Sequence, residues 1–194
     1  VLETVPIAGT RRRGRNPDDE IRMENELLNS EKELAEHIML VDLARNDLAR
    51  VSVPGTIDTY ELIRLKKFPN IMHLISKIRS KSYLDPFKIL KSMFPAGTVS
   101  GAPKKRAMQI IHELETEDRG PYAGCVGYVS FAGDMDMAIS IRTMFNKDSK
   151  YIAQAGAGIV ADSKAEEEYL ETENKMKGIL STINLARILE ENKK

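Results

Sequence analysis

The chain has 194 residues, of which 42% are hydrophobic and 30% charged, as is usual for a folded globular domain. Its 29 basic and 29 acidic side chains cancel, which argues against a generic polyanion binder. No apolar stretch approaches the roughly 20 residues of a membrane-spanning helix, and the N-terminus lacks a secretory signal. The single cysteine, Cys125, excludes an intrachain disulfide and favours a reducing, cytoplasmic compartment.

The N-terminal half of the chain is expected to alternate strands and helices. The expected elements are a strand with a basic turn (1–16), a helix (18–28), a second helix (30–47), a short strand (50–53), a strand or helix (57–64) and an apolar run (70–81). The second helix has the strongest signal, because Ser30 and Glu33 have the spacing of a capping box.

The sequence of the C-terminal half predicts a hairpin between helices. Its expected elements are a helix (86–93), a loop (97–103) that feeds a helix (103–116), a hairpin (124–131 with 135–144), a third strand (150–158) and a long helix (163–190). Ser163 and Glu166 have the spacing of a second capping box. The fold class predicted from this order is α+β, a mostly antiparallel sheet flanked by helices.

Two pairs of glutamates are candidates for binding a metal ion. Glu33 and Glu36 lie three residues apart on one predicted helix, and Glu168 and Glu171 repeat that spacing on the last helix. Carboxylates that converge from two helices would suit Mg²⁺, a hard ion with oxygen ligands. The spacing alone equally fits a helix cap and a solvated helix face.

Arg142 closes an alternating segment, 136–142, in which it falls on the face opposite the apolar side chains. An arginine above small residues can hold a carboxylate through two parallel hydrogen bonds, although a solvated sheet face would show the same pattern. The small residues of 153–158 could let backbone amides approach an anionic ligand, or could simply allow close packing. A dinucleotide-binding interpretation is rejected because no βαβ unit surrounds the glycines.

His73 lies in an apolar run and could be either a core or a catalytic residue. The basic run 11–15 could suggest nucleic-acid binding. The zero net charge and the lack of interleaved aromatic residues favour a solvated turn instead.

Six ordered segments carry a resemblance to a known family: PIAGTR (6–11), LVDLARNDL (40–48), FPAGTVSGAPK (94–104), GPYAG (120–124), ISIRT (139–143) and ETENK (171–175). Together they resemble the chorismate-utilising enzymes, and most closely the anthranilate-forming branch. The resemblance implies that residues 1–194 are the C-terminal part of a catalytic domain built as a large α/β sandwich. The remaining N-terminal portion would be absent, so the isolated chain is expected to expose apolar surface and a sheet edge.

The resemblance also implies roles for the glutamates and for His73. Glu36 and Glu171 match the family's Mg²⁺ ligands, and Glu33 and Glu168 match their partners. The metal would neutralise and orient the ring carboxylate of chorismate. His73 matches the family histidine implicated in the elimination chemistry.

A second set of positions matches the residues that hold the substrate. Arg142 and Tyr122 match those that bind the enolpyruvyl carboxylate. The remaining pocket positions carried over by the resemblance are Gly9, Thr10, Gly156, Gly158 and Lys175.

The implied reaction is Mg²⁺-dependent conversion of chorismate and ammonia to anthranilate and pyruvate, in tryptophan biosynthesis. A glutamine amidotransferase subunit would supply the ammonia. Ala8 stands where aminodeoxychorismate synthases usually carry a nucleophilic lysine, and the motif 42–47 is less typical of the isochorismate enzymes. Aminodeoxychorismate synthase, isochorismate synthase and a catalytically inactive fragment remain the alternatives.

Overall fold

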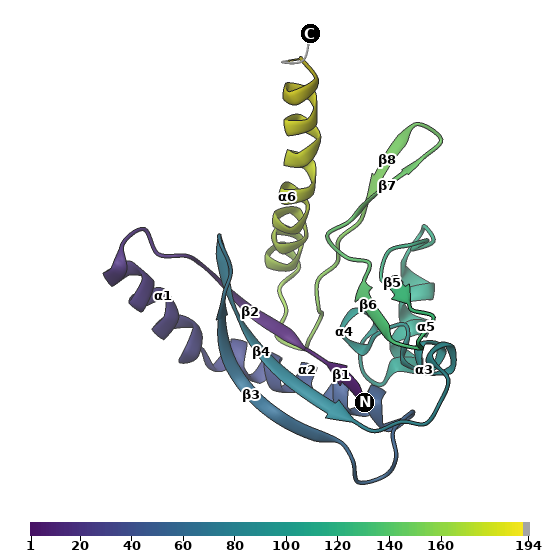
Figure 1. Ribbon diagram of the computed structural model, residues 1–194. Helices are drawn as coiled ribbons and strands as arrows, with labels where there is room; N and C mark the ends of the chain where they lie inside the picture. The colour runs from purple at the N-terminus through teal and green to yellow at the C-terminus, as the bar shows by residue number, and fades with distance from the viewer. Residues whose placement is uncertain (192–194) are drawn as a thin grey trace. The chain divides into compact units, whose positions relative to one another are not determined.

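The computed structural model describes residues 1–191 and divides the chain into two compact units, residues 1–98 and residues 99–194. Figure 1 shows the course of the chain through the helices and strands of each unit. The α+β class is confirmed, since antiparallel sheets and helices occur together.

The sheet of the first unit is organised around β4 (Ile71–Ser80). On one side β4 pairs with β3 (Asp58–Lys67), and on the other with β1 (Leu2–Thr4) and β2 (Ile7–Arg12) in succession, always antiparallel. The register of β2 slips between Ala8 and Thr10, which leaves Gly9 in a bulge. This bulge positions several candidate site residues.

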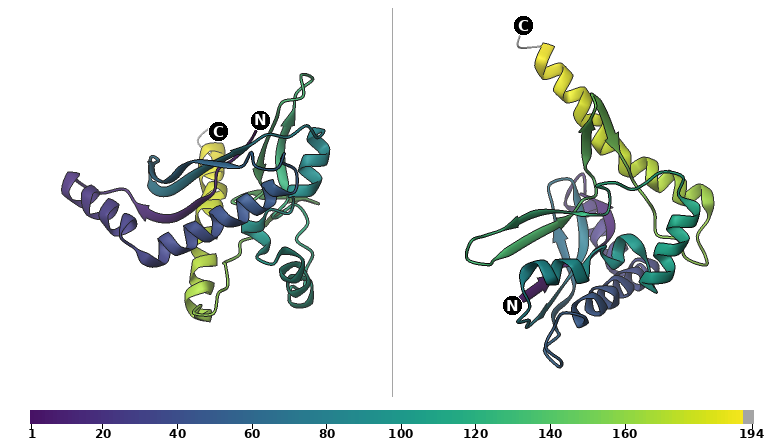
Figure 2. Two further views of the ribbon diagram at one scale, coloured as in Figure 1. Left: turned by 90° about the horizontal axis from the view of Figure 1, so that it is seen from below. Right: turned by 90° about the vertical axis from the view of Figure 1, so that its right-hand side faces the viewer.

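Helices α1 (Pro17–Leu28) and α2 (Glu31–Ala49) both pack on this sheet, as Figure 2 shows. Local chemistry sets where each begins. The Asn16 side chain accepts the N–H of Asp19, and the Ser30 hydroxyl accepts the N–H of Glu33 at 3.4 Å. The expected cap at Ser30 is thereby confirmed.

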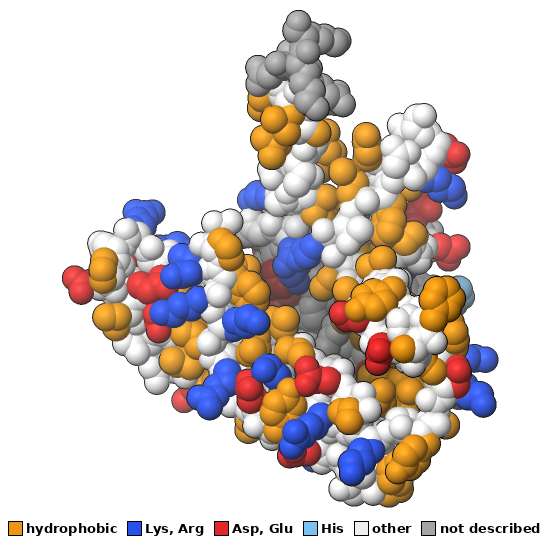
Figure 3. All heavy atoms as spheres, in the orientation of Figure 1, with side chains coloured by type: hydrophobic (Ala, Val, Ile, Leu, Met, Phe, Trp, Pro, Cys, Tyr) orange, Lys and Arg blue, Asp and Glu red, His pale blue; other side chains and the backbone are white. Residues whose placement is uncertain are grey.

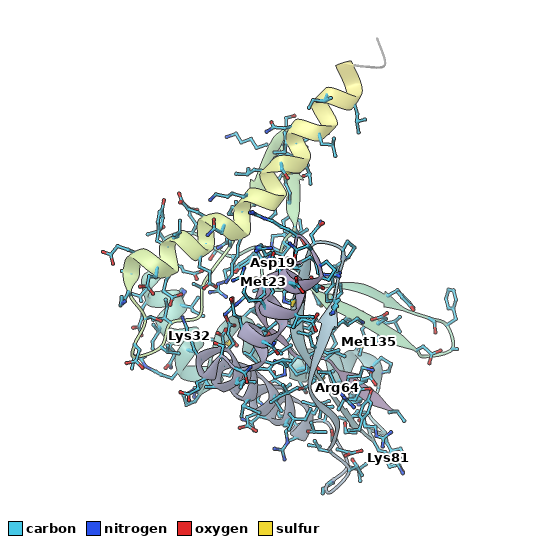
Figure 4. All side chains as sticks on the ribbon, turned by 90° about the vertical axis from the view of Figure 1, so that its left-hand side faces the viewer. Asp19, Met23, Lys32, Arg64, Lys81 and Met135 are labelled. Carbon is cyan, nitrogen blue, oxygen red and sulfur yellow. The ribbon has the colours of Figure 1, made fainter. Side chains whose placement is uncertain are left out.

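The core of the first unit lies between these helices and the sheet. Alternate residues of β4 are buried toward the helices, as the period of a strand requires. They form two clusters: Met23, Leu27, Met72 and Leu74; and Val41, Ala44, Leu48 and Ile78. Met23 marks the first cluster in Figure 4. This packing fixes α1 and α2 against β4.

Two shorter helices follow the sheet. The first is α3 (Pro86–Met93), capped by the Asp85 side chain, which accepts the N–H of Phe87 at 2.9 Å. The second, α4 (Gly97–Ser100), occupies part of the segment predicted as a loop. Its first residue is fixed by a buried carboxylate, because the N–H of Gly97 donates to Asp47 at 2.9 Å.

The described part of the second unit consists of two helices and two two-stranded hairpins. They are α5 (Lys104–Leu114), the hairpin of β5 (Cys125–Val129) and β6 (Met135–Ile139), the hairpin of β7 (Met144–Lys147) and β8 (Lys150–Ala153), and α6 (Ala165–Glu191). Among its described residues only Ala123 and Ile179 are buried hydrophobic ones. The leucines along α6 and Phe131 at the tip of the first hairpin are exposed. Hydrophobic side chains at the surface are orange in Figure 3.

Several local predictions were wrong. Residues 50–53 form a turn, not a strand, because Val51 N–H and the Ser52 hydroxyl both donate back to the Leu48 carbonyl. The predicted third strand, 150–158, stops at Ala153. The expected cap at Ser163 is also wrong, since its hydroxyl accepts the N–H of Val160 and the last helix begins at Ala165.

None of the helices in the described part of the chain is both long and apolar enough to cross a membrane.

Candidate functional site

The bulge in β2 brings three predicted site residues into contact. Gly9 has φ +70, a left-handed conformation that suits glycine. Its carbonyl oxygen lies 2.8 Å from Nδ1 of His73, and the Thr10 hydroxyl lies 3.1 Å from the same nitrogen. Because a carbonyl can only accept, Nδ1 of His73 carries the proton. A neutral His73 therefore keeps its lone pair on Nε2.

Glu33 reaches the same bulge from α2. A Cβ atom on Gly9 would stand 3.2 Å from Oε2 of Glu33, so the absence of a side chain lets the carboxylate approach the strand. Oε1 of Glu33 accepts a hydrogen bond from Nη1 of Arg11 at 2.8 Å. Arg11 was missed as a partner of Glu33, although it stands in the PIAGTR segment two residues after Gly9.

Glu36, the second predicted metal ligand on α2, is exposed one helical turn further on. Ala8, the residue that argues against a nucleophilic lysine, is buried opposite Leu74 in the register of β2 and β4. The first unit thus gathers Gly9, Thr10, Glu33 and His73 at one bulge.

A chain of contacts links predicted residues of the second unit. Nζ of Lys175 donates to the carbonyl oxygen of Gly156 at 2.8 Å and forms an ion pair with Glu171. A Cβ atom on Gly156 would lie 3.0 Å from the hydroxyl of Tyr122. Each of these residues therefore contacts the next: Glu171 contacts Lys175, Lys175 contacts Gly156, and Gly156 lies close to Tyr122.

Tyr122 is suited to donating a hydrogen bond. Burial raises the pKa of its phenol, and this effect outweighs the opposing effect of the Arg119 guanidinium, which lies 5.5 Å from the ring centre. The phenol is therefore neutral at physiological pH and carries a proton that it can donate to an anion.

Arg142 does not belong to a strand, so the alternation that predicted its orientation does not extend to it. β6 ends at Ile139, and Arg142 is exposed with φ +54, an uncommon conformation for a residue with a side chain. The electrostatic effect of its guanidinium reaches Tyr122, where it lowers the pKa of the phenol, a smaller effect than that of burial. Gly158 is exposed, with open space where a Cβ would stand.

The predicted metal ligands lie on two helices. Glu33 and Glu36 lie on α2 of the first unit, and Glu168 and Glu171 lie on α6 of the second. Among residues 1–191, no group of three or more His, Cys, Asp or Glu side chains could hold a metal ion. The chemistry of the four carboxylates fits a hard divalent cation, and the Mg²⁺ site stays a prediction.

Comparison with known proteins places the chain in a family. A family model described as chorismate binding enzyme matches residues 1–181. The chain is 53% identical over 192 residues to anthranilate synthase component 1 of Aquifex aeolicus, covering 98% of this chain and 39% of that protein. It is 50% identical over 187 residues to the component 1 of Saccharolobus solfataricus, covering 95% of this chain and 44% of that protein.

Solved structures agree with this assignment. The crystal structure of anthranilate synthase component I from Streptococcus pneumoniae matches with a TM-score of 0.80 and 48% identity, covering 91% of this chain and 39% of that one. A putative 2,3-dihydroxybenzoate-specific isochorismate synthase from Bacillus anthracis matches with a TM-score of 0.79 and 27% identity, covering 94% of this chain and 49% of that one. The chain belongs to the chorismate binding enzyme family, and it spans about two fifths of the length of the curated relatives it matches.

Proposed function

We propose that this chain is part of an anthranilate synthase large subunit, which converts chorismate and ammonia to anthranilate and pyruvate in tryptophan biosynthesis. The observation that carries the proposal is the 53% identity over 98% of the chain with a protein of that name. Ala8 supports it, because a buried alanine opposite Leu74 leaves no amine there to attack the ring. Ammonia would then add directly.

The four glutamates are proposed to hold Mg²⁺, with Glu36 and Glu171 as ligands and Glu33 and Glu168 as their partners. When bound, the ion would supply positive charge that neutralises the ring carboxylate of chorismate. Two of these glutamates already interact with basic side chains, Glu33 with Arg11 and Glu171 with Lys175. Cation binding therefore has to compete with, or add to, these two ion pairs.

Arg142 and the neutral phenol of Tyr122 are proposed to bind the enolpyruvyl carboxylate. A guanidinium can offer two parallel N–H donors to a carboxylate, and the phenol can add a third donor. The backbone at Gly9, Thr10, Gly156 and Gly158 would line the pocket, and Lys175 would complete it from α6. The close approach of Gly156 to Tyr122 supports this grouping.

His73 is proposed to accept a proton during loss of pyruvate. In this step a ring C–H bond breaks and its electron pair joins the aromatic ring. The ring C–O bond breaks as well, and its electron pair leaves with the oxygen as the enolate of pyruvate, which then takes up a proton from solvent at its methylene carbon. Nε2 of His73 is suited to take the proton, because the carbonyl of Gly9 holds the other proton on Nδ1. Thr10 supports the same ring orientation.

The proposed partner is a glutamine amidotransferase subunit that releases ammonia, and the proposed location is the cytoplasm. We do not propose nucleic acid as a partner. The ion pairs of Arg12 with Asp19 and of Arg13 with Glu20 support a structural role for the basic run. The likeness to an isochorismate synthase keeps isochorismate as a second candidate product.

The test is product analysis. The chain, alone and fused to the N-terminal portion that the resemblance predicts, is mixed with chorismate, Mg²⁺ and ammonium, and anthranilate fluorescence and pyruvate release are followed together. Anthranilate that a chelator abolishes supports the proposal, whereas aminodeoxychorismate or isochorismate identifies another branch. Failure of both forms would leave the inactive-fragment alternative.

Variants in the same assay test the metal ligands. Glu171→Gln should abolish Mg²⁺-dependent turnover, because it removes the charge of a proposed ligand. Glu173→Gln, an exposed glutamate on the same helix, is the matched control. Turnover that survives Glu171→Gln would show that this metal assignment is wrong.

A further inference from the structure

A buried polar contact lies between α2 and the sheet, among mostly apolar side chains. His37 and Ser76 have no exposed surface, and Nε2 of His37 lies 2.7 Å from the Ser76 hydroxyl. The same hydroxyl accepts the backbone N–H of Ile63 at 3.0 Å. Ile63 has φ +50, which is strained for a β-branched residue, at an irregularity in the register of β3. One serine thus joins α2, β4 and β3.

The proton on His37 can be assigned from the surroundings. Nδ1 of His37 is buried without a hydrogen-bond partner within the described part of the chain. A buried N–H without an acceptor is rarer and more costly than a buried lone pair without a donor. The proton therefore sits on Nε2, which donates to Ser76. The Ser76 oxygen then receives two N–H donors, one from α2 and one from β3.

The elements joined in this way carry the predicted catalytic groups. Glu36 directly precedes His37, and Glu33 lies one helical turn before it. His73 lies three residues before Ser76 on β4, and its ring is held at the bulge that Glu33 also reaches. Apolar packing is not directional, whereas a buried hydrogen bond restricts the rotation and the height of α2 over β4.

We propose that His37 is a positioning residue, which together with Ser76 sets the Glu33 and Glu36 carboxylates against the β2 bulge and His73. This inference rests on the proposed function, because it takes the roles of the glutamates and of His73 from there. A purely structural role makes a different prediction. Replacing both partners of a buried hydrogen bond by apolar side chains is often neutral for stability, so a structural pair could be removed without loss of function.

The test compares two double variants of the full chain. His37→Leu with Ser76→Ala removes the proposed contact. Ser52→Ala with Ser80→Ala removes a second serine contact at the end of α2 and β4, where the hydroxyls are 2.7 Å apart. His37→Gln keeps a side-chain N–H donor in place of the ring. Mn²⁺ serves as the probe, and its binding is measured by electron paramagnetic resonance in the presence of chorismate.

We expect the His37 and Ser76 variant to fold with unchanged circular dichroism and to bind Mn²⁺ about tenfold more weakly, as do proteins that lose a residue orienting metal ligands. The Mn²⁺ affinities of His37→Gln and of the Ser52 and Ser80 variant should stay within about twofold of that of the unsubstituted chain. Loss of folding in the first variant, or unchanged Mn²⁺ binding, would overturn the inference.

A structural readout separates this inference from the proposed function. If the unsubstituted chain binds no Mn²⁺, the proposed metal role fails, and crystal structures of both double variants then decide the positioning role. In the His37 and Ser76 variant the 2.8 Å contact between Arg11 and Glu33 should open beyond the roughly 4 Å limit of an ion pair. In the Ser52 and Ser80 variant it should persist. A contact that persists in both would contradict the positioning role.

Discussion

The two units differ in how they bury apolar side chains. The first unit packs two clusters of buried residues between a sheet and two helices. In the described part of the second unit, only Ala123 and Ile179 are buried hydrophobic residues, while Tyr169, Leu180 and Leu185 are exposed on α6. Since apolar burial is the main favourable contribution to folding, the first unit has a source of stability that the second lacks.

This difference bears on the candidate site. Gly9, Thr10, Glu33 and His73 are held on a framework with its own core. Tyr122, Gly156 and Lys175 are held by hydrogen bonds and close contacts among two-stranded hairpins and a helix, and a two-stranded hairpin is marginally stable by itself. The residues of the second unit that are proposed to bind substrate therefore lack the support of a core comparable to that of the first unit.

The largest expected effect comes from separating the units. A fragment of residues 1–98 should fold cooperatively, and a fragment of residues 99–194 should not, because only the first has clusters of buried residues. Chemical denaturation followed by circular dichroism, with dispersion of amide proton signals as a second probe, measures this. A cooperative transition in the second fragment would remove the contrast between the units.

Leucine truncations should sharpen the same contrast. Leu48 is fully buried in the first unit, and Leu185 is 56% exposed on α6 of the second. Leu48→Ala should lower the free energy of unfolding by about 2–5 kcal/mol, through lost burial and a cavity. Leu185→Ala should change it by less than about 0.5 kcal/mol. Urea denaturation of the whole chain gives both values, and equal losses would show that Leu185 is buried in solution.

Two glycines of the second unit provide a smaller, paired test. Gly156→Ala would place a Cβ 3.0 Å from the Tyr122 hydroxyl, so we expect weaker chorismate binding, by about 1 kcal/mol if one phenol hydrogen bond is lost. Gly178→Ala meets open space on α6 and should instead stabilise the helix by about 0.5–1 kcal/mol. Calorimetric titration with chorismate and thermal denaturation distinguish the two. Unchanged binding by the Gly156 variant would argue against a pocket there.

The smallest expected effect concerns acid stability of the first unit. Hydrogen bonds from the Arg12 side chain, the backbone N–H of Arg15 and the Arg22 side chain hold the pKa of the Asp19 carboxyl well below its usual range. A lowered folded-state pKa stabilises the protein above the unfolded pKa, and this contribution is lost as the pH falls toward the folded value. The Asp19→Asn variant should therefore be less stable than the unsubstituted chain at pH 7. The difference in stability between the two should shrink below about pH 4.

Denaturation midpoints across pH measure this, with Asp18→Asn, an exposed neighbour on the same helical turn, as the control. A pH-independent difference between Asp19→Asn and the unsubstituted chain would contradict the electrostatic explanation.

The sequence predicted those parts of the fold that depend on neighbouring residues. The start of α2 follows from Ser30, and the start of α3 was predicted at Pro86, the residue that Asp85 precedes as a cap. These signals act within a few residues, so they depend little on tertiary contacts, although the same spacing at Ser163 did not cap α6. The ordered motifs also sufficed to predict the family, which the match over residues 1–181 confirms.

Predictions failed where tertiary contacts outweigh local pattern. Residues 50–53 have the composition of a strand, yet the Ser52 hydroxyl donates to the Leu48 carbonyl and contacts the Ser80 hydroxyl, and the segment forms a turn. The alternation that ended in Arg142 predicted a longer strand, but β6 stops at Ile139. Propensity is a weak signal over four or five residues, because packing and hydrogen bonding of comparable energy can reverse it.

The sequence by itself therefore determined the family, most helices and the residues to examine, since these depend on identity and near neighbours. Only the tertiary structure decided which of those residues meet. His73 contacts Gly9 across a separation of 64 residues, and Arg11 contacts Glu33 across 22. Such pairs form because burial of alternate β4 side chains sets the register of β2 and packs α2 on the sheet. A slip of one residue in β4 would turn every one of its side chains to the other face.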